Sequence, residues 1–141
     1  MRKNIEEPIK KGVGPVVSYM IHCVIGIAVI LCLSFLFSVF ISSGKVPESF
    51  MAGCAYISVF IGTAVASNLS ARKFGRGVLS SLLQGFILLL IIYIIGSAVF
   101  GRLVPTEALP EIILACFCGA LVGAVLSALG KHKGKRRKHS R

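Results

Sequence analysis

Four long apolar segments alternate with short polar segments along the chain. The apolar segments cover roughly residues 16–41, 50–69, 78–100 and 111–129. Because a helix needs about 20 residues to cross roughly 30 Å of hydrocarbon, each segment is long enough to span a membrane. None of them alternates apolar with polar residues as a membrane β-strand does, and a helix satisfies its own backbone hydrogen bonds in lipid. The pattern predicts an all-α membrane protein with four transmembrane helices.

The same pattern divides the 141 residues into one membrane domain and two polar ends. We expect residues 1–12 to form an amino-terminal segment, residues 13–130 the four-helix transmembrane domain and residues 131–141 a basic tail. Pro15 suits the first turn of the first helix, where its missing N–H is no loss. Since the connections are short, consecutive helices should pack as antiparallel neighbours in a bundle.

Basic residues lie mainly on one side of these spans. They are concentrated in the amino-terminal segment, the second connection and the tail, whereas the first and third connections contain one each, Lys45 and Arg102. Cytoplasmic loops hold the excess of Lys and Arg in membrane proteins. Both termini and the second connection are therefore predicted to be cytoplasmic.

The net charge of +11 fits a membrane surface better than nucleic acid. The cations flank apolar spans instead of covering a folded basic face, and each Lys or Arg near an anionic leaflet gains about 1 kcal/mol. We predict contact with anionic lipid headgroups and no nucleic-acid binding. The cations expected to make this contact are Arg72, Lys73, Arg76, Lys135, Arg136, Arg137 and Lys138.

Small residues recur at helical spacing on the second, third and fourth spans. Such stripes let helix backbones approach closely in a membrane, where van der Waals contact replaces the hydrophobic drive. We predict that they pack helices within the monomer, and the alternative is a homodimer interface. The positions are Gly62, Ala66, Gly85, Gly119, Gly123 and Ser127.

Three polar side chains share one depth in the predicted spans. His22 lies about six residues, or roughly 9 Å, from the cytoplasmic edge of the first span. Gln84 and Thr63 lie at a similar depth in the third and second spans. We predict that the three form one polar layer. In the preferred interpretation, a neutral His22 bonds Gln84 or a backbone carbonyl and fixes helix register; in the alternative, the layer lines a passage.

The residue patterns of catalysis and metal binding are missing from the sequence. None of the five acidic residues lies at mid-membrane, where a proton- or cation-coupled transporter usually needs one. No paired acids, Ser/His/Asp set or glycine-rich phosphate loop is present. The five cysteines form no CxxC pair and are interpreted as packing residues. We predict no enzyme activity, no cofactor and no metal.

The second connection contains the basic turn Ala71-Arg72-Lys73-Phe74-Gly75-Arg76-Gly77, followed by Ser81 and Gly85. On these residues, residues 55–96 resemble a family of small four-span integral membrane proteins of unknown function from Gram-positive bacteria. The Gly119/Gly123 helix and the basic tail also fit that family. The resemblance implies four helices in the bacterial cytoplasmic membrane, and it supplies no catalytic residues.

Taken together, these features predict a non-enzymatic accessory or assembly subunit of a membrane complex, because the segments outside the membrane are too small for much else. The expected partners are the lipid bilayer and another membrane protein or further copies of the chain. One alternative is a small oligomeric transporter or channel whose passage is lined by His22, Gln84 and Thr63. A second is a holin-like pore former, which the small size and charged tail suggest.

Overall fold

The computed structural model describes residues 3–75, 77–101 and 107–138, and the side chains within residues 14–75, 77–99, 101 and 107–130. These residues form α1 (Lys3–Ser42), η1 (Glu48–Phe50), α2 (Met51–Phe74), α3 (Val78–Phe100) and α4 (Leu109–Lys138). The stretches long and apolar enough to cross a membrane are Gly14–Ser42, Glu48–Phe74, Val78–Val99 and Leu109–Gly130. The prediction of an all-α protein with four helices able to span a membrane is confirmed.

The first and last helices extend beyond their apolar stretches. α1 begins at Lys3 and passes through Pro15, so the expectation that Pro15 occupies the first turn was wrong. The residues ahead of it combine helix-favouring Lys and Glu with Pro8, Gly12 and Gly14, which disfavour a helix interior. A proline inside a helix removes one hydrogen bond to the carbonyl four residues earlier and does not have to end the helix. At the other end of the chain, α4 continues through the basic tail to Lys138.

The turn between α2 and α3 depends on two glycines. Gly75 ends α2 with φ 68°, and its N–H donates to the carbonyl of Ala71 at 3.2 Å. Gly77 precedes α3 with φ 55°. Residues with a Cβ adopt such left-handed angles only at a cost, whereas glycine does not. The chain therefore reverses within three residues, and α3 returns beside α2.

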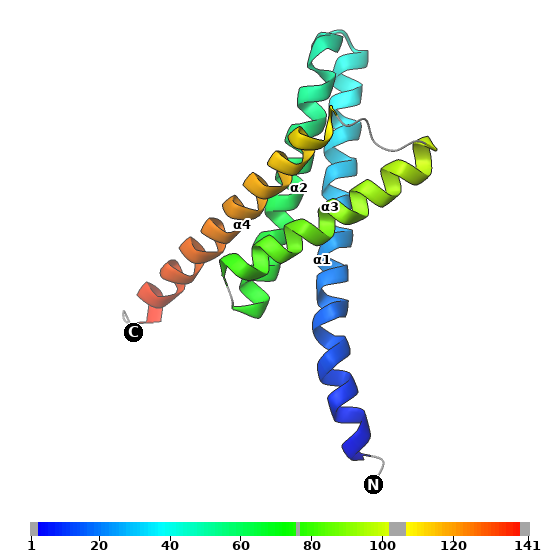
Figure 1. The fold of residues 1–141 in the computed structure, drawn as a ribbon. Coiled ribbons are helices and arrows are strands. Elements are labelled where there is room, and N and C mark those ends of the chain that lie inside the picture. The colour runs from blue at the N-terminus through cyan, green and yellow to red at the C-terminus, as the bar shows by residue number, and fades with distance from the viewer. Residues whose placement is uncertain (1–2, 76, 102–106, 139–141) are drawn as a thin grey trace.

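The helices alternate in direction, and the start of α1 and the end of α4 lie toward the same end of the molecule (Figure 1). α1 and α2 form a hairpin, and α3 and α4 cross it obliquely (Figure 1). α2 is the central helix, in contact with α1, α3 and α4. The carboxyl-terminal part of α3 diverges from the other helices (Figure 1).

Buried residues are concentrated at the end of the bundle that holds the α2–α3 turn. They fall within residues 18–26 of α1, 58–71 of α2, 80–88 of α3 and 116–127 of α4. Residues 27–42 of α1 and 89–99 of α3 are all described and contain no buried position. The bundle therefore has a closed end, defined by these buried ranges, and a splayed end, where α1 meets α2 and α3 runs free.

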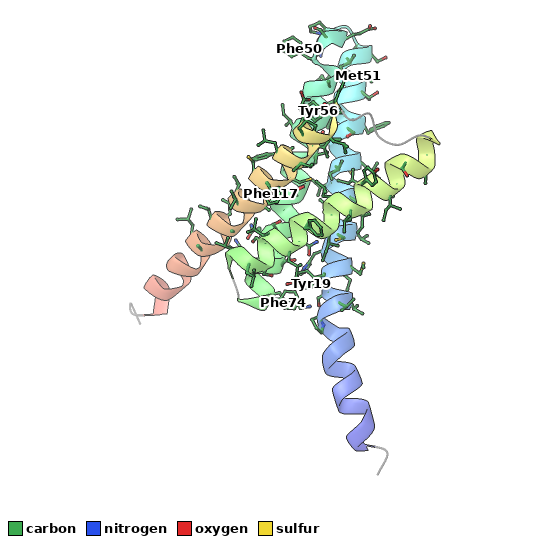
Figure 2. The ribbon with its side chains drawn as sticks, in the orientation of Figure 1. Tyr19, Phe50, Met51, Tyr56, Phe74 and Phe117 are labelled. Atoms are coloured by element: carbon green, nitrogen blue, oxygen red, sulfur yellow. The ribbon has the colours of Figure 1, made fainter. Side chains whose placement is uncertain are left out.

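The interior consists of small and polar residues, and the large apolar side chains point outward. Leu88 is the one large aliphatic side chain that is buried among the described residues. Phe35 and Val99 are each 72% exposed, and the labelled side chains of Phe50, Met51 and Phe117 also lie at the surface (Figure 2). Lipid solvates such outer faces, while close backbone contact holds the helices together inside. The distribution of side chains is that of a membrane protein.

Candidate functional site

A cluster of polar side chains joins α1, α2 and α3 at the closed end. Within each helix its members recur three or four residues apart, which places them on one face. We call the set the polar cluster; it comprises Tyr19, His22 and Cys23 of α1, Ser67 and Ser70 of α2, and Ser80, Ser81 and Gln84 of α3.

Ser70 is the centre of this cluster, because its hydroxyl contacts both His22 and Gln84. The Ser70 Oγ donates to Gln84 Oε1 at 2.8 Å, and His22 Nδ1 lies 2.8 Å from the same Oγ. An amide oxygen can only accept, so the single hydroxyl proton is directed to Gln84. His22 Nδ1 must therefore carry a proton and donate it to Ser70. One serine fixes which nitrogen of the imidazole is protonated.

The amide group of Gln84 connects α3 to α1. Its Nε2 donates to Cys23 Sγ at 2.9 Å and to the backbone carbonyl of Tyr19 at 3.4 Å. With Oε1 accepting from Ser70, both amide hydrogens and the amide oxygen have partners. Gln84 is fully buried, and an unpaired amide there would carry its full desolvation penalty. Partners on α1 and α2 thus satisfy the buried amide of α3.

Further hydrogen bonds hold the same end together. Ser67 Oγ donates to the carbonyl of Ser81 at 3.2 Å, and Ser81 Oγ donates to the carbonyl of Ser67 at 3.3 Å. The Tyr19 hydroxyl lies 3.0 Å from Ser80 Oγ. The Tyr19 ring stacks on Phe74 with centroids 4.5 Å apart, beside the α2–α3 turn (Figure 2). These contacts fix the rotation of three helices relative to one another.

The structure brings two of the three residues of the predicted polar layer together. His22 and Gln84 meet through Ser70 and not directly. Thr63 is not hydrogen-bonded to them: its hydroxyl donates to the carbonyl of Val59 at 2.8 Å and lies 3.9 Å from Cys116 Sγ on α4. The apolar pattern predicted that the second span ends at residue 69, whereas α2 ends at Phe74. Thr63 therefore lies about 7.5 Å deeper than expected at 1.5 Å per residue.

Ser70 and the other serines of the cluster were not predicted from the sequence as polar partners. Ser67 and Ser70 lie three residues apart on α2, and Ser81 and Gln84 have the same spacing on α3. That repeated spacing was the feature of the sequence from which a polar contact between α2 and α3 could have been predicted. It was ambiguous, because serine serves both as a small packing residue and as a hydrogen-bonding residue in membranes.

The small residues expected to pack helices are all buried. A Cβ on Gly119 would lie 2.6 Å from the carbonyl oxygen of Phe60, and one on Gly123 would lie 2.7 Å from that of Ala64. On the neighbouring face of α4, Ala120 meets Gly85 of α3. The full set that is buried is Gly62, Ala66, Gly85, Gly119, Gly123 and Ser127. Gly119 and Gly123 therefore pack against α2, and Ala120 packs against α3.

Two of the cations expected to contact anionic lipid are described, and both are exposed at the end of α2. Arg72 donates through Nε to Asn68 Oδ1 at 2.9 Å and lies beside Gly130 of α4. Lys73 is exposed next to it. Arg76 lies outside the described residues. So do the side chains of Lys135, Arg136, Arg137 and Lys138, although the backbone there is helical.

The Ser70–His22 pair has the atoms of a nucleophile and a base but not their arrangement. A catalytic serine gives its proton to histidine, whereas Ser70 gives its proton to Gln84 and receives one from His22. The Ser70 side chain is also 0% exposed. Among the described residues, no group of three His, Cys, Asp or Glu side chains is placed to hold a metal ion. The geometry is suited to joining helices.

Comparison with protein-family models, with curated proteins and with solved structures gave no match to this chain. The resemblance to the four-span family therefore remains a prediction from the sequence.

Proposed function

We propose that the chain is a non-enzymatic accessory or assembly subunit of a larger complex in the bacterial cytoplasmic membrane. The observation that supports this most directly is the closure of the polar cluster. Within the described residues, every buried side-chain nitrogen and oxygen atom has a hydrogen-bond partner. A passage for ions or polar solutes needs polar groups that can exchange partners with the solute. Ser70 and Gln84 instead form their hydrogen bonds with groups of the neighbouring helices.

The outward faces support the same proposal. The splayed halves of α1 and α3 present large apolar side chains, among them Phe35 and Val99, that remain exposed in the part of the chain that the structure describes. In the proposed complex, a neighbouring membrane protein covers these faces in place of lipid. The proposed orientation places the closed end, with Arg72 and Lys73, at the cytoplasmic surface.

Co-purification is the test of this proposal. The tagged protein, expressed at its natural level and extracted in mild detergent, should retain a membrane-protein partner in stoichiometric amount by mass spectrometry. Phe35→Ala and Val99→Ala should weaken that retention, because these side chains point outward and leave the polar cluster intact. Recovery of the chain alone, or only as a self-oligomer, would contradict the proposal.

A flux measurement examines the transporter and channel alternative. Protein in liposomes should show no uptake or conductance under a proton, cation or anion gradient. Flux by the wild-type protein that disappears in a folded His22→Ala variant would overturn the accessory function. Lysis of cells upon expression would overturn it in favour of a holin-like pore former.

A further inference from the structure

An open groove of about 340 Å³ lies between α2 and α4 toward the splayed end. Tyr56 and Phe60 line the α2 wall, and Glu111, Leu114 and Ala115 line the α4 wall. Figure 2 shows Tyr56 beside the first turns of α4.

The two walls form a groove that is charged at one end and apolar along the rest. Tyr56 and Phe60 are one helical turn apart on α2, and Glu111 and Ala115 are one turn apart on α4. Glu111 stands in the first turn of α4, while Cys118, a further lining residue, is roughly 10 Å along the axis. Ala115 leaves room between them because its side chain is small. The groove therefore presents a charged group at one end and an apolar surface along the rest, which matches the headgroup and acyl chain of a lipid.

Glu111 lies closer to the middle of the bundle than Met51, the first residue of α2. It shares the groove with Tyr56, which is five residues from the helix start at Met51, or roughly 7.5 Å along the axis. The α4 dipole favours an anion at this position. None of the residues that line the groove is basic. Glu111 is exposed, and the Tyr56 hydroxyl is close enough to hydrogen-bond its carboxylate. The groove walls supply no cation, so the ammonium of a bound lipid can pair with it.

We propose that this groove binds a membrane lipid whose headgroup carries a primary ammonium. The ammonium pairs with the Glu111 carboxylate against the face of Tyr56, and the acyl chain lies along Phe60, Leu114 and Ala115. An anionic headgroup would meet the carboxylate as a like charge. The site is independent of the accessory function, since it concerns lipid selection and not a protein partner.

Lipid retention by the full-length protein tests the site. The protein is exchanged into equimolar phosphatidylethanolamine and phosphatidylglycerol of the same acyl chains, and bound lipid is counted by native mass spectrometry. We expect retention of phosphatidylethanolamine over phosphatidylglycerol, and a loss of that preference by roughly fivefold in Glu111→Gln, the scale of one exposed ion pair. Glu107→Gln is the matched control, because Glu107 is exposed just before α4 and does not line the groove.

A second pair of measurements separates the headgroup from the acyl chain. N-acetylated phosphatidylethanolamine has the same chains without the cation, and it should bind no better than phosphatidylglycerol. Ala115→Leu should reduce retention of phosphatidylethanolamine because the larger side chain fills the groove. Tyr56→Leu should reduce retention without adding bulk. Circular dichroism and gel filtration check that both variants fold. Equal retention of the acetylated lipid, or unchanged preference in Glu111→Gln, would overturn the proposal.

Discussion

Ser70 is the single residue on which the polar cluster depends. Its hydroxyl accepts from His22 on α1 and donates to Gln84 on α3, while its backbone belongs to α2. No other side chain in the cluster contacts two helices besides its own through one atom. Its role depends on hydrogen bonding and not on volume, because alanine would fill nearly the same space.

Replacing Ser70 with alanine should destabilise the bundle. The change leaves His22 Nδ1 and Gln84 Oε1 without partners, and we expect a loss of about 1–2 kcal/mol in the free energy of unfolding. Unfolding in mixed micelles measures it. Ser38→Ala is the control, because Ser38 is exposed on α1 outside the cluster. The double variant with His22→Ala should lose less than the sum of the single losses; additive losses would mean that the two residues do not interact.

Glycine substitutions separate close contact from helix propensity. A Cβ at Gly123 would lie 2.7 Å from Ala64 O and from Ser67 Cβ, whereas one at Gly53 meets nothing within 4 Å. Gly123→Ala should therefore lower the unfolding free energy by about 1–3 kcal/mol through overpacking. Gly53→Ala should be neutral or stabilising by up to about 1 kcal/mol, since alanine favours helix. Equal effects of the two substitutions in the same unfolding assay would contradict the packing of α4 on α2.

At the scale of elements, α2 organises the fold. It contacts α4 through Gly119 and Gly123, α1 through Gly62, and α3 through the reciprocal bonds of Ser67 and Ser81. The helix is capped at its end by Gly75, whose left-handed conformation lets the chain turn back at once into α3. The helix and its end cap together position the polar cluster.

The cap at Gly75 has a conformational role that can be measured. No atom lies within 4 Å of a Cβ built there, so the effect of a side chain comes from φ 68° alone. Gly75→Ala should cost about 1–2 kcal/mol of unfolding free energy, and Gly75→Asn less, because asparagine tolerates this region better. Gly14→Ala, in the body of α1 with open space around it, should cost nothing. An equal change in unfolding free energy for Gly75→Ala and Gly14→Ala would contradict a conformational role of Gly75.

At the scale of the whole molecule, the bundle is polar and closed at one end and apolar and splayed at the other. The cations Arg72 and Lys73 mark the closed end, and Glu111 lies on the splayed side of the buried residues of α4. In the proposed orientation, the polar cluster lies in the cytoplasmic leaflet and the groove of Tyr56 and Glu111 lies in the outer leaflet.

Reporter fusions measure that orientation. Alkaline phosphatase, which is active only outside the cytoplasm, should be active when fused after Lys45 in the first connection. It should be inactive when fused after Arg141, where a fluorescent protein should instead be bright. The expected result follows from the excess of Lys and Arg on the cytoplasmic side. An active phosphatase at Arg141 would reverse the orientation and place the polar cluster in the outer leaflet.

Part of the closed end could be predicted from the sequence. His22 and Gln84 stood out because polar side chains are rare in apolar spans, and the small positions Gly119 and Gly123 stood out by their spacing. Thr63 was grouped with them because depth was counted from a helix end placed too early. The sulfur of Cys23 and the carbonyl of Tyr19 could not be identified as partners of Gln84, since they have no signature in a sequence.

The amino-acid sequence alone established that the chain is helical, that four helices can cross a membrane and which positions are small enough for close contact. These properties are one-dimensional: hydrocarbon thickness sets the length of a span, and the absence of water forces the backbone into helix. The tertiary structure decided which helix faces meet, that Ser70 joins His22 to Gln84, and that the bundle closes at one end only. Rotation and crossing of helices depend on many side-chain contacts formed together, and no local pattern encodes them.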